Sequence, residues 1–320
     1  MKHSVTVFSI FIPTELAGLA LGIASLGWCW EYFLNFQGKA QMSGALLASV
    51  LLLALLFKFI LNPNLLKKEL SHHMNGCIVP TFAMATMVVS NNINHFNHQV
   101  ALYLWLSAII LHVAFLVVFI YYRIKDFKFK YMLPSWFIPP VGIVVAAVSF
   151  PGGQSINIAN TILMFGLVVY FILLPILLYR YFLHNKFALH EQPTIAIFAA
   201  PASLCLTGYL TVTEQPSVQL VAMLTFIALS MTLFVYCSFN WLLRLPFSPA
   251  YSSFTFPLVI GATAMFKTNQ YLISSGYSLQ LAELVEYIAC VELTIATLMV
   301  IYVSLRYVMY FRNELKGRWC

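Results

Sequence analysis

Long apolar stretches separated by short polar breaks run along the chain from Val5 to Tyr310. A helix needs about 20 largely apolar residues to cross the hydrocarbon core of a bilayer. The pattern predicts ten membrane-spanning helices, at residues 6–29, 40–62, 76–94, 99–122, 131–150, 156–182, 193–212, 217–243, 249–268 and 281–310. Ten crossings place both termini on one side, and we interpret residues 1–320 as a single all-α membrane domain.

Prolines reveal a repeat that hydropathy alone does not show. Each odd-numbered predicted helix carries one in its interior or near its start: Pro13, Pro80, Pro140, Pro201 and Pro257. The intervals between them are 56 to 67 residues. Such a period indicates a two-helix unit used five times, and repeats of this kind are a common building plan of transport proteins.

The two helices of each unit also differ in side-chain size. Odd-numbered helices are rich in small residues, as at 17–25 and 199–203, whereas even-numbered helices carry bulky runs, as at 51–57 and 115–120. Small residues let helix backbones approach closely in lipid, and bulky aliphatic residues suit a surface that faces lipid. The pattern predicts an inner ring of odd-numbered helices inside an outer shell of even-numbered ones.

Composition excludes a soluble fold, because 61% of the residues are hydrophobic and 8% are charged, where a soluble domain has about 25% charged residues. The net charge of +7 does not indicate a nucleic-acid partner, because the basic residues lie at predicted helix ends. The ten spans place 15 of the 17 Lys and Arg on one side and only Lys39 and Lys267 on the other. That side, with both termini, is predicted to be cytoplasmic.

The five prolines suggest a pore through the inner ring. A proline within a helix leaves a carbonyl without its hydrogen bond, which is tolerated at membrane depth where the carbonyl faces protein or water. The alternative is that these prolines only bend helices for packing, as Pro175 does in an even-numbered helix. No Lys or Arg lies in the middle of an odd-numbered helix, so we expect an anion to be held weakly, by hydroxyls, amides and helix N-termini.

Two acids fall within predicted spans, and an acid at such a position is a functional candidate. Glu15, two residues after Pro13, either faces the pore and tunes permeation or has a structural role. Glu292 lies on a predicted outer helix, where a hydrogen bond to a neighbouring helix or subunit is the simpler interpretation.

No cofactor, metal or catalytic site is predicted. His95 and His98 have an HxxH spacing in a polar loop but no evident third ligand, and the six cysteines form no CxxC pair. The motifs of zinc peptidases, nucleotide-binding loops and serine hydrolases are absent from the sequence. The expected partners are therefore small inorganic anions and the lipid bilayer.

Three segments carry a resemblance to a known family. They are Pro13-Thr14 followed by 18–22 (GLALG), 193–210 with Pro193-Thr194 and Ala200-Pro201-Ala202, and 251–257 (YSSFTFP). With ten paired spans, the chain resembles the tellurite-resistance TehA and plant slow-type anion channel family, also called the tellurite-resistance/dicarboxylate transporters. The resemblance covers nearly the full length.

The resemblance implies five helical hairpins with quasi-fivefold symmetry around a central pore in each subunit, and a homotrimer with three separate pores. It implies further that a phenylalanine of the ninth helix plugs the pore. Phe256 matches that position and Phe254 is the second candidate, and the alternative for this residue is a core aromatic between helices. Phe82, Phe137 and Phe198 on other inner helices are candidates for narrowing the same path.

These features lead us to expect a gated channel for small monovalent anions such as chloride and nitrate, in the inner membrane of a bacterium. The alternative is a carrier of C4-dicarboxylates or of tellurite and related oxyanions, and a third is a sensor or scaffold without flux. A carrier is expected to show a charged midplane site. The sequence has no Lys or Arg at such a position, which favours the channel.

Overall fold

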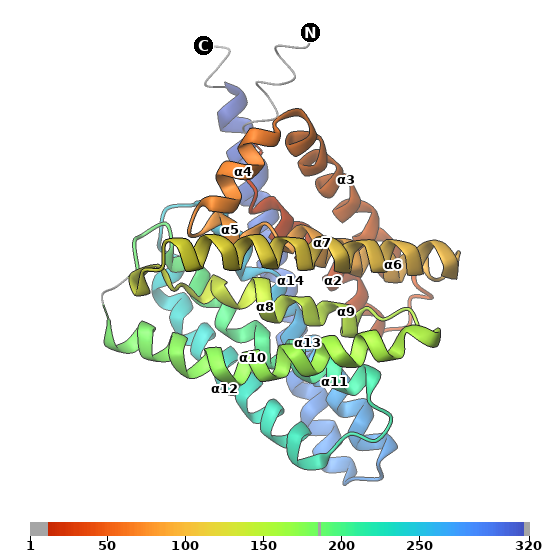
Figure 1. The fold of residues 1–320 in the computed structure, drawn as a ribbon. Coiled ribbons are helices and arrows are strands. Elements are labelled where there is room, and N and C mark those ends of the chain that lie inside the picture. Colours follow the sequence, from red (N-terminus) through yellow and green to blue (C-terminus); the bar gives the residue numbers. More distant parts are fainter. Residues whose placement is uncertain (1–11, 185–186, 317–320) are drawn as a thin grey trace.

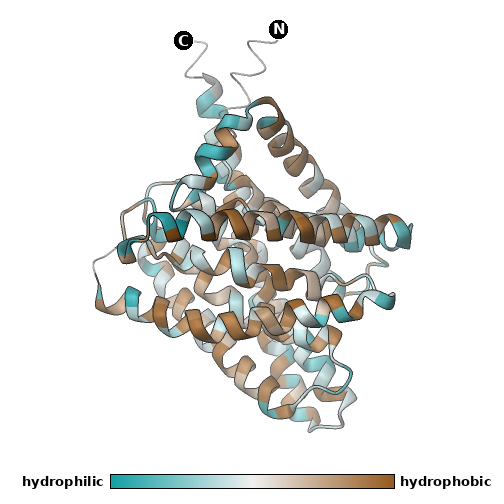
Figure 2. Cartoon of the chain, viewed as in Figure 1, coloured by the Kyte–Doolittle hydropathy of each residue, from teal (hydrophilic) through white to brown (hydrophobic). Residues whose placement is uncertain are grey.

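The computed structural model describes residues 12–184 and 187–316, and within them the chain is helical with no β-strand (Figure 1). Within these residues, eight helices are long and apolar enough to cross a membrane. Brown, apolar positions follow the middle of the helices in Figure 2, and teal, polar positions gather at many of their ends. The structure thus supports a polytopic α-helical membrane protein.

Eight of the ten predicted spans correspond to these helices. They are α2 (Leu16–Phe33), α3 (Lys39–Leu61), α5 with α6 (Asn75–Ile78 and Thr81–Ile93), α7 (His98–Lys125), α10 (Ile156–Leu183), η5 with α11 (Gln192–Ala199 and Ala200–Val212), α12 (Val218–Leu242) and α14 (Leu279–Lys316). The label η denotes a 3-10 segment. The first helix starts later than predicted, at Leu16, and the predicted residues 6–11 lie outside the described residues.

The fifth and ninth predicted spans are less regular. The fifth is a broken run of short pieces, η2 (Pro134–Phe137), α8 (Ile138–Val141), η3 (Gly142–Val144) and α9 (Val145–Val148). The ninth begins with η6 (Pro249–Phe254) and continues as α13 (Phe256–Ser274), whose second half holds Lys267, Thr268 and Asn269. Prolines in the first and polar residues in the second explain why neither forms a long, uniformly apolar helix.

Two classes of helix differ in burial. In α3, α7, α10, α12 and α14 only 28–39% of the residues in the most apolar stretch are buried, against 56–89% in α2, in α5 with α6, and in η5 with α11. We call the first five the outer helices. The inner segments are α2, α5–α6, η2–α9, η5–α11 and η6–α13. The difference matches the small and bulky residues that distinguish the two classes in the sequence.

The inner segments contact one another in a closed circle. Helix α2 packs against α6, α6 against α9, α9 against α11, α11 against α13, and α13 against α2 again. Each inner segment also packs against the outer helix that follows it in the chain. The inner segments therefore surround a common centre, with the outer helices around them.

The five repeated prolines lie at the beginnings of helical pieces. Pro201 and Pro257 occupy the first turns of α11 and α13, Pro80 is the N-cap residue of α6, and Pro140 lies in the short helix α8. The carbonyl of Pro13 accepts the Leu16 amide, 3.1 Å away, where α2 begins. A proline at a helix start replaces an N–H that has no intrahelical partner in any case. Pro80, Pro140 and Pro201 also lie within longer helical runs, at 75–93, 134–148 and 192–212, close to the point where one helical piece meets the next.

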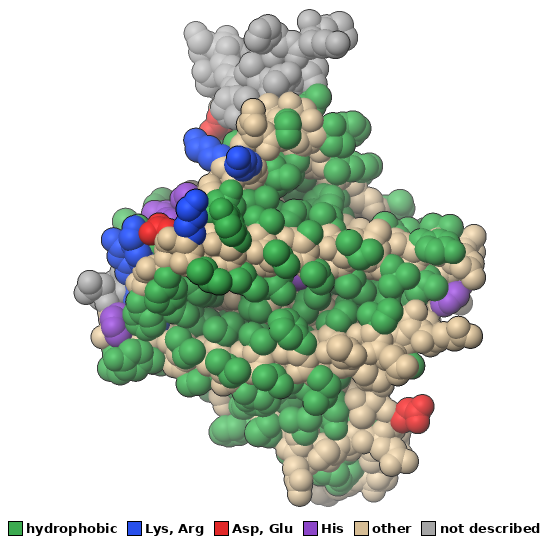
Figure 3. Space-filling view, viewed as in Figure 1, with side chains coloured by type: hydrophobic (Ala, Val, Ile, Leu, Met, Phe, Trp, Pro, Cys, Tyr) green, Lys and Arg blue, Asp and Glu red, His purple; other side chains and the backbone are tan. Residues whose placement is uncertain are grey.

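Basic side chains gather at one end of the molecule. Figure 3 shows Lys and Arg side chains over α4 (Pro63–Ser71) and the neighbouring end of α7, while apolar side chains cover the middle of the visible face. The end of α14 lies on the same side as α4 (Figure 1). This segregation agrees with the one-sided distribution of Lys and Arg deduced from the sequence.

Candidate functional site: a divided cavity inside the ring

A cavity of about 50 Å³ lies at the centre of the ring. Every inner segment contributes to its wall, with Leu21 from α2, Met84 from α6, Phe137 from η2, Ile197 from η5 and Phe256 from α13 among the lining residues. The polar side chains in the wall are the hydroxyls of Thr81, Ser252 and Ser253. We call this space the lower cavity. None of the described residues that line it carries a charge.

A second cavity of about 10 Å³, the upper cavity, is lined mostly by later residues of the same inner segments. Ser25 and Thr263 supply its hydroxyls, and Val88, Val145 and Val148 are among its apolar lining residues. A space of this size holds at most one water molecule.

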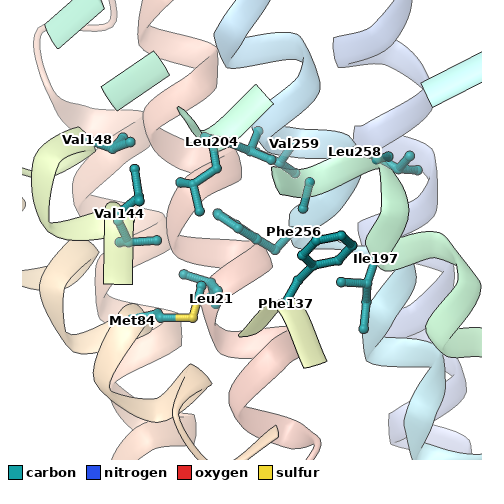
Figure 4. Packing of buried hydrophobic residues seen from close by; sticks show 14 of the residues in the cluster. Leu21, Met84, Phe137, Val144, Val148, Ile197, Leu204, Phe256, Leu258 and Val259 are labelled. Atoms are coloured by element: carbon teal, nitrogen blue, oxygen red, sulfur yellow. The ribbon is translucent and has the colours of Figure 1, made fainter. Parts of the chain in front are cut away.

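Phe256 and Leu204 line both cavities, so they lie at the boundary between them. Figure 4 shows Phe256 pointing into the centre of the ring, with Leu21, Leu204 and Phe137 around it. The Phe256 side chain is only 7% exposed. The Phe256 ring and the Leu204 isobutyl group thus form an apolar partition between the two cavities.

The backbone around Thr255 directs Phe256 inward. Thr255 joins η6 to α13 with φ −93° and ψ −83°, and its hydroxyl lies 2.7 Å from the carbonyl of Ser252 and 3.1 Å from that of Gly18. Helix α2 lies close to this junction: a Cβ placed on Gly22 would lie 2.5 Å from the Thr255 side chain. The small residues of α2 thus fix the place where α13 begins.

Phe254, the second gate candidate, has a different environment. It is fully buried and packs against Tyr251 and Phe239, with ring centroids 4.8 and 5.5 Å away. It lines neither of the two cavities. Its contacts are those of a core aromatic between η6 and the outer helix α12.

Of the other phenylalanines predicted to narrow the path, one lines a cavity and two do not. Phe137 lines the lower cavity and makes an edge contact with Phe198, 6.1 Å between centroids. Phe198 is buried against Tyr181 and Phe234, and the partly buried Phe82 packs against the core; neither lines a cavity. Of the predicted prolines, Pro201 and Pro257 line the lower cavity and Pro13, Pro80 and Pro140 line neither.

Leu204 and Met84 are wall residues that sequence reasoning did not select. They follow Pro201 by three residues and Pro80 by four. A position one turn after each repeated proline shares its helix face. That spacing is the signal by which these two residues could have been found.

Glu15 lies at the start of α2 and lines neither cavity. Its neighbour Thr14 belongs to a buried cluster with Lys58 and Glu69. The Lys58 ammonium lies 2.7 Å from Glu69 Oε1 and 2.8 Å from the Thr14 hydroxyl, which itself donates to Glu69 Oε2. Burial raises the pKa of Glu69, and the hydrogen bond from Lys58 acts in the opposite direction. The sequence placed Lys58 among the basic residues of one side, but its side chain is 1% exposed.

Glu292 is buried on α14, with 4% of its surface exposed, and faces α12 and α13. Its Oε2 and the Thr232 hydroxyl lie 2.9 and 3.6 Å from the point where a Cβ at Gly261 would stand. Neither of these oxygens finds a hydrogen-bond partner among the described residues. The bond to a neighbouring helix expected from the sequence is therefore not made by Oε2 within the described chain.

The part of the chain that the structure describes holds no group of three or more metal-ligating side chains. The rings of His95 and His98 bond to Gln41 and Asn94, at 3.2 and 2.8 Å. The described cysteines are free, and Cys320 lies outside the described residues.

The fold and its centre define a class of protein: a polytopic helical membrane protein with small cavities enclosed by its own inner segments. A profile of the voltage-dependent anion channel family matches residues 12–308. The chain belongs to this family, whose members are channels and transporters rather than enzymes.

Two relatives are similar over part of the chain, and both are named uncharacterized transporters of Methanocaldococcus jannaschii. MJ0576 is 25% identical over 147 residues, which are 42% of each chain. MJ0762 is 25% identical over 170 residues, which are 49% of this chain and 50% of the relative. The chain spans about half the length of these relatives or less.

Proposed function

We propose that the protein is a gated channel for small monovalent anions such as chloride and nitrate, with Phe256 as the gate. The observation that carries this proposal is the position of Phe256 between two cavities that the five inner segments enclose. Moving this ring aside would join the cavities into one path along the axis of the ring. Phe254 is then a packing residue.

The same proposal includes an architecture. The two irregular inner segments, η2–α9 and η6–α13, cross the membrane with the eight long helices, which gives ten crossings with quasi-fivefold symmetry. The basic end of the molecule, with both termini, is cytoplasmic, and three subunits assemble, each with its own pore, in a bacterial inner membrane. The closed circle of inner contacts and the one-sided basic residues support this arrangement.

Lack of charge in the cavities favours a channel over a carrier. A site that captures a dicarboxylate or an oxyanion is expected to present Arg or Lys. The described lining residues of both cavities offer hydroxyls and apolar groups only. Weak interaction of this kind lets an anion enter and leave, as conduction requires.

The test is anion current in planar bilayers for the wild type, Phe256→Ala and Phe254→Ala, first in chloride and then in nitrate. We expect Phe256→Ala to raise the current roughly tenfold or more, equivalent to a barrier lowered by about 1.4 kcal/mol. Phe254→Ala, two residues away but outside the cavities, is the matched control and leaves the current near that of the wild type.

If Phe254→Ala conducts and Phe256→Ala does not, the gate is misassigned. If none of the three proteins conducts, but proteoliposomes take up labelled succinate or tellurite with saturation, the carrier replaces the channel.

A further inference from the structure

A basic hollow of about 580 Å³ opens at the end of the molecule that carries α4, and it shares no lining residue with either cavity. Its wall includes Lys68 and His72 near the end of α4, Arg123 and Lys125 at the end of α7, and Tyr131 of η1 (Phe129–Tyr131). We call this hollow the basic pocket. Blue and purple side chains mark this region in Figure 3, over α4 and the adjacent end of α7. Its volume falls in the range of small-molecule sites.

Arg123 supplies the pocket with a guanidinium that is already held in position by its neighbours. Only 7% of its surface is exposed, its Nη2 donates to the carbonyl of Ser71 at 2.7 Å, and its guanidinium lies 5.9 Å from the Phe119 ring. Its Nε is buried and has no hydrogen-bond partner among the described residues. A buried donor left unpaired calls for an explanation, and a guanidinium held in place is suited to a phosphate or carboxylate.

The positive charge of the pocket is not neutralised by its neighbours. Asp126, the one acid in the wall, lies 3.0 Å from Lys128. Lys68, Arg123 and Lys125 form no ion pair in the described parts of the chain. Burial, and next the neighbouring His73 and Arg123, lower the pKa of His72, so a further positive charge is disfavoured there. An anion in the pocket would relieve this crowding.

The surroundings of the pocket indicate where that anion comes from. The same end of α7 carries the exposed apolar side chains of Ile120 and Ile124, the latter 77% exposed, and the exposed Phe127 follows just after the helix ends. These side chains are suited to contact with acyl chains. Basic pockets beside such surfaces bind anionic headgroups.

We propose that the basic pocket binds the phosphate group of an anionic phospholipid, with Arg123 as the central donor and with Lys68 and Lys125 at the rim. The inference rests on the pocket alone and does not depend on the proposed conduction. Its chemistry would also accept free phosphate, so the experiment separates the two sources.

The experiment measures the thermal unfolding midpoint of the purified full-length protein in detergent. Short-chain phosphatidic acid, the zwitterionic phosphatidylcholine of the same chain length, and inorganic phosphate are titrated separately. The variants are Arg123→Gln, Lys68→Gln and Lys125→Gln, and Arg244→Gln, an exposed arginine outside the pocket, is the matched control. Lys68 and Lys125 are exposed, so their variants keep the fold even where Arg123→Gln does not.

We expect phosphatidic acid to raise the midpoint more than phosphatidylcholine does. Each rim variant should weaken its binding about fivefold, because a basic residue near a membrane surface contributes about that factor, and Arg244→Gln should not. A larger response to inorganic phosphate than to phosphatidic acid, lost in the rim variants, would overturn the lipid as ligand. Equal responses of the rim variants and Arg244→Gln would overturn the pocket itself. Since no current is measured, these outcomes are independent of the gate.

Discussion

The cavities inside the ring and the basic pocket at the helix ends differ in size, in enclosure and in the charge of their lining residues. The cavities are narrow, enclosed and lined by apolar groups and hydroxyls, with Phe256 between them. The pocket is open and roughly ten times larger than the lower cavity, and it presents Lys and Arg without matching acids. If both proposals hold, an anion would pass through the cavities and would stay bound in the pocket. The protein keeps the charges that would hold an anion away from the path that would conduct it.

The basic end also holds a buried ion pair, Lys58 with Glu69. Removing one partner of this pair should have the largest effect on stability. Lys58→Met leaves Glu69 beside α3 without its 2.7 Å partner, and we expect the free energy of unfolding to fall by about 3 kcal/mol. The double variant Lys58→Met/Glu69→Leu should recover most of this loss, because no unpaired charge remains. Denaturant titration in detergent measures both values.

The pH dependence of the Lys58→Met variant tests the cause. Burial already raises the pKa of Glu69, and without Lys58 this pKa should rise further. A carboxyl whose pKa is raised in the folded protein contributes stability that is present at acidic pH and lost as pH rises through that pKa. The difference from the wild type should therefore shrink as pH falls towards 4.5, the ordinary value of the group. An equal difference at all pH values would mean that lost packing, not charge, is responsible.

Close packing dominates at the inner ring, where Gly22→Ala should cost about 1 to 3 kcal/mol of stability. The new methyl would stand 2.5 Å from the Thr255 side chain, which is held by its own hydrogen bonds. Gly142→Ala is the control from the cavity wall, because there the methyl meets the flexible end of Met84 at 2.7 Å. Thermal unfolding should rank Gly22→Ala as the more damaging change. The reverse order would mean that the junction at Thr255 yields more easily than a methionine side chain.

The smallest effect concerns pH and separates the two regions directly. Binding of sulfate, which stays dianionic, should strengthen up to about fivefold as pH falls below 6.5, because His72 then gains charge in the pocket. Burial lowers the pKa of His72 most, His73, Arg123 and His190 lower it further, and Glu191 raises it. By contrast, the current through Phe256→Ala should not follow this titration, since none of the described residues that line either cavity is titratable. Currents that rise and fall with the His72 titration would link the pocket to the pore.

Hydropathy predicted the positions of most helices, and the proline repeat predicted which of them correspond to one another. The apolar pattern predicted ten spans, and eight of them correspond to described helices long and apolar enough to cross a membrane. The other two, around Pro140 and Pro257, are a broken run of short pieces and a helix with polar residues in its second half. Side-chain size predicted which helices are inner. The repeat did not show that its prolines begin helical pieces, because that depends on the 3-10 segments that precede α11 and α13.

The candidate site was harder to predict because neighbouring residues face opposite ways. Phe254 and Phe256 are alike in sequence, but the turn at Thr255 sends one towards α12 and the other towards the centre of the ring. In the sequence, Lys58 resembles the other basic residues at helix ends. It is buried in the structure because α4 folds back and brings Glu69 beside it. Arg123 gave no signal beyond its charge. These placements depend on tertiary contacts, which periodicity does not contain.

The uncharged wall of the ring has a consequence for the order in which anions would pass. An ion that enters the lower cavity would lose much of its hydration shell. Among the described lining residues, the hydroxyls of Thr81, Ser252 and Ser253 are the side-chain groups that could replace those water molecules. Neither cavity offers a cation to offset that loss of hydration. The ease of passage is then set by how readily each ion gives up its own water. Large, diffuse anions would cross more easily than compact ones of the same charge, and multivalent ones least of all.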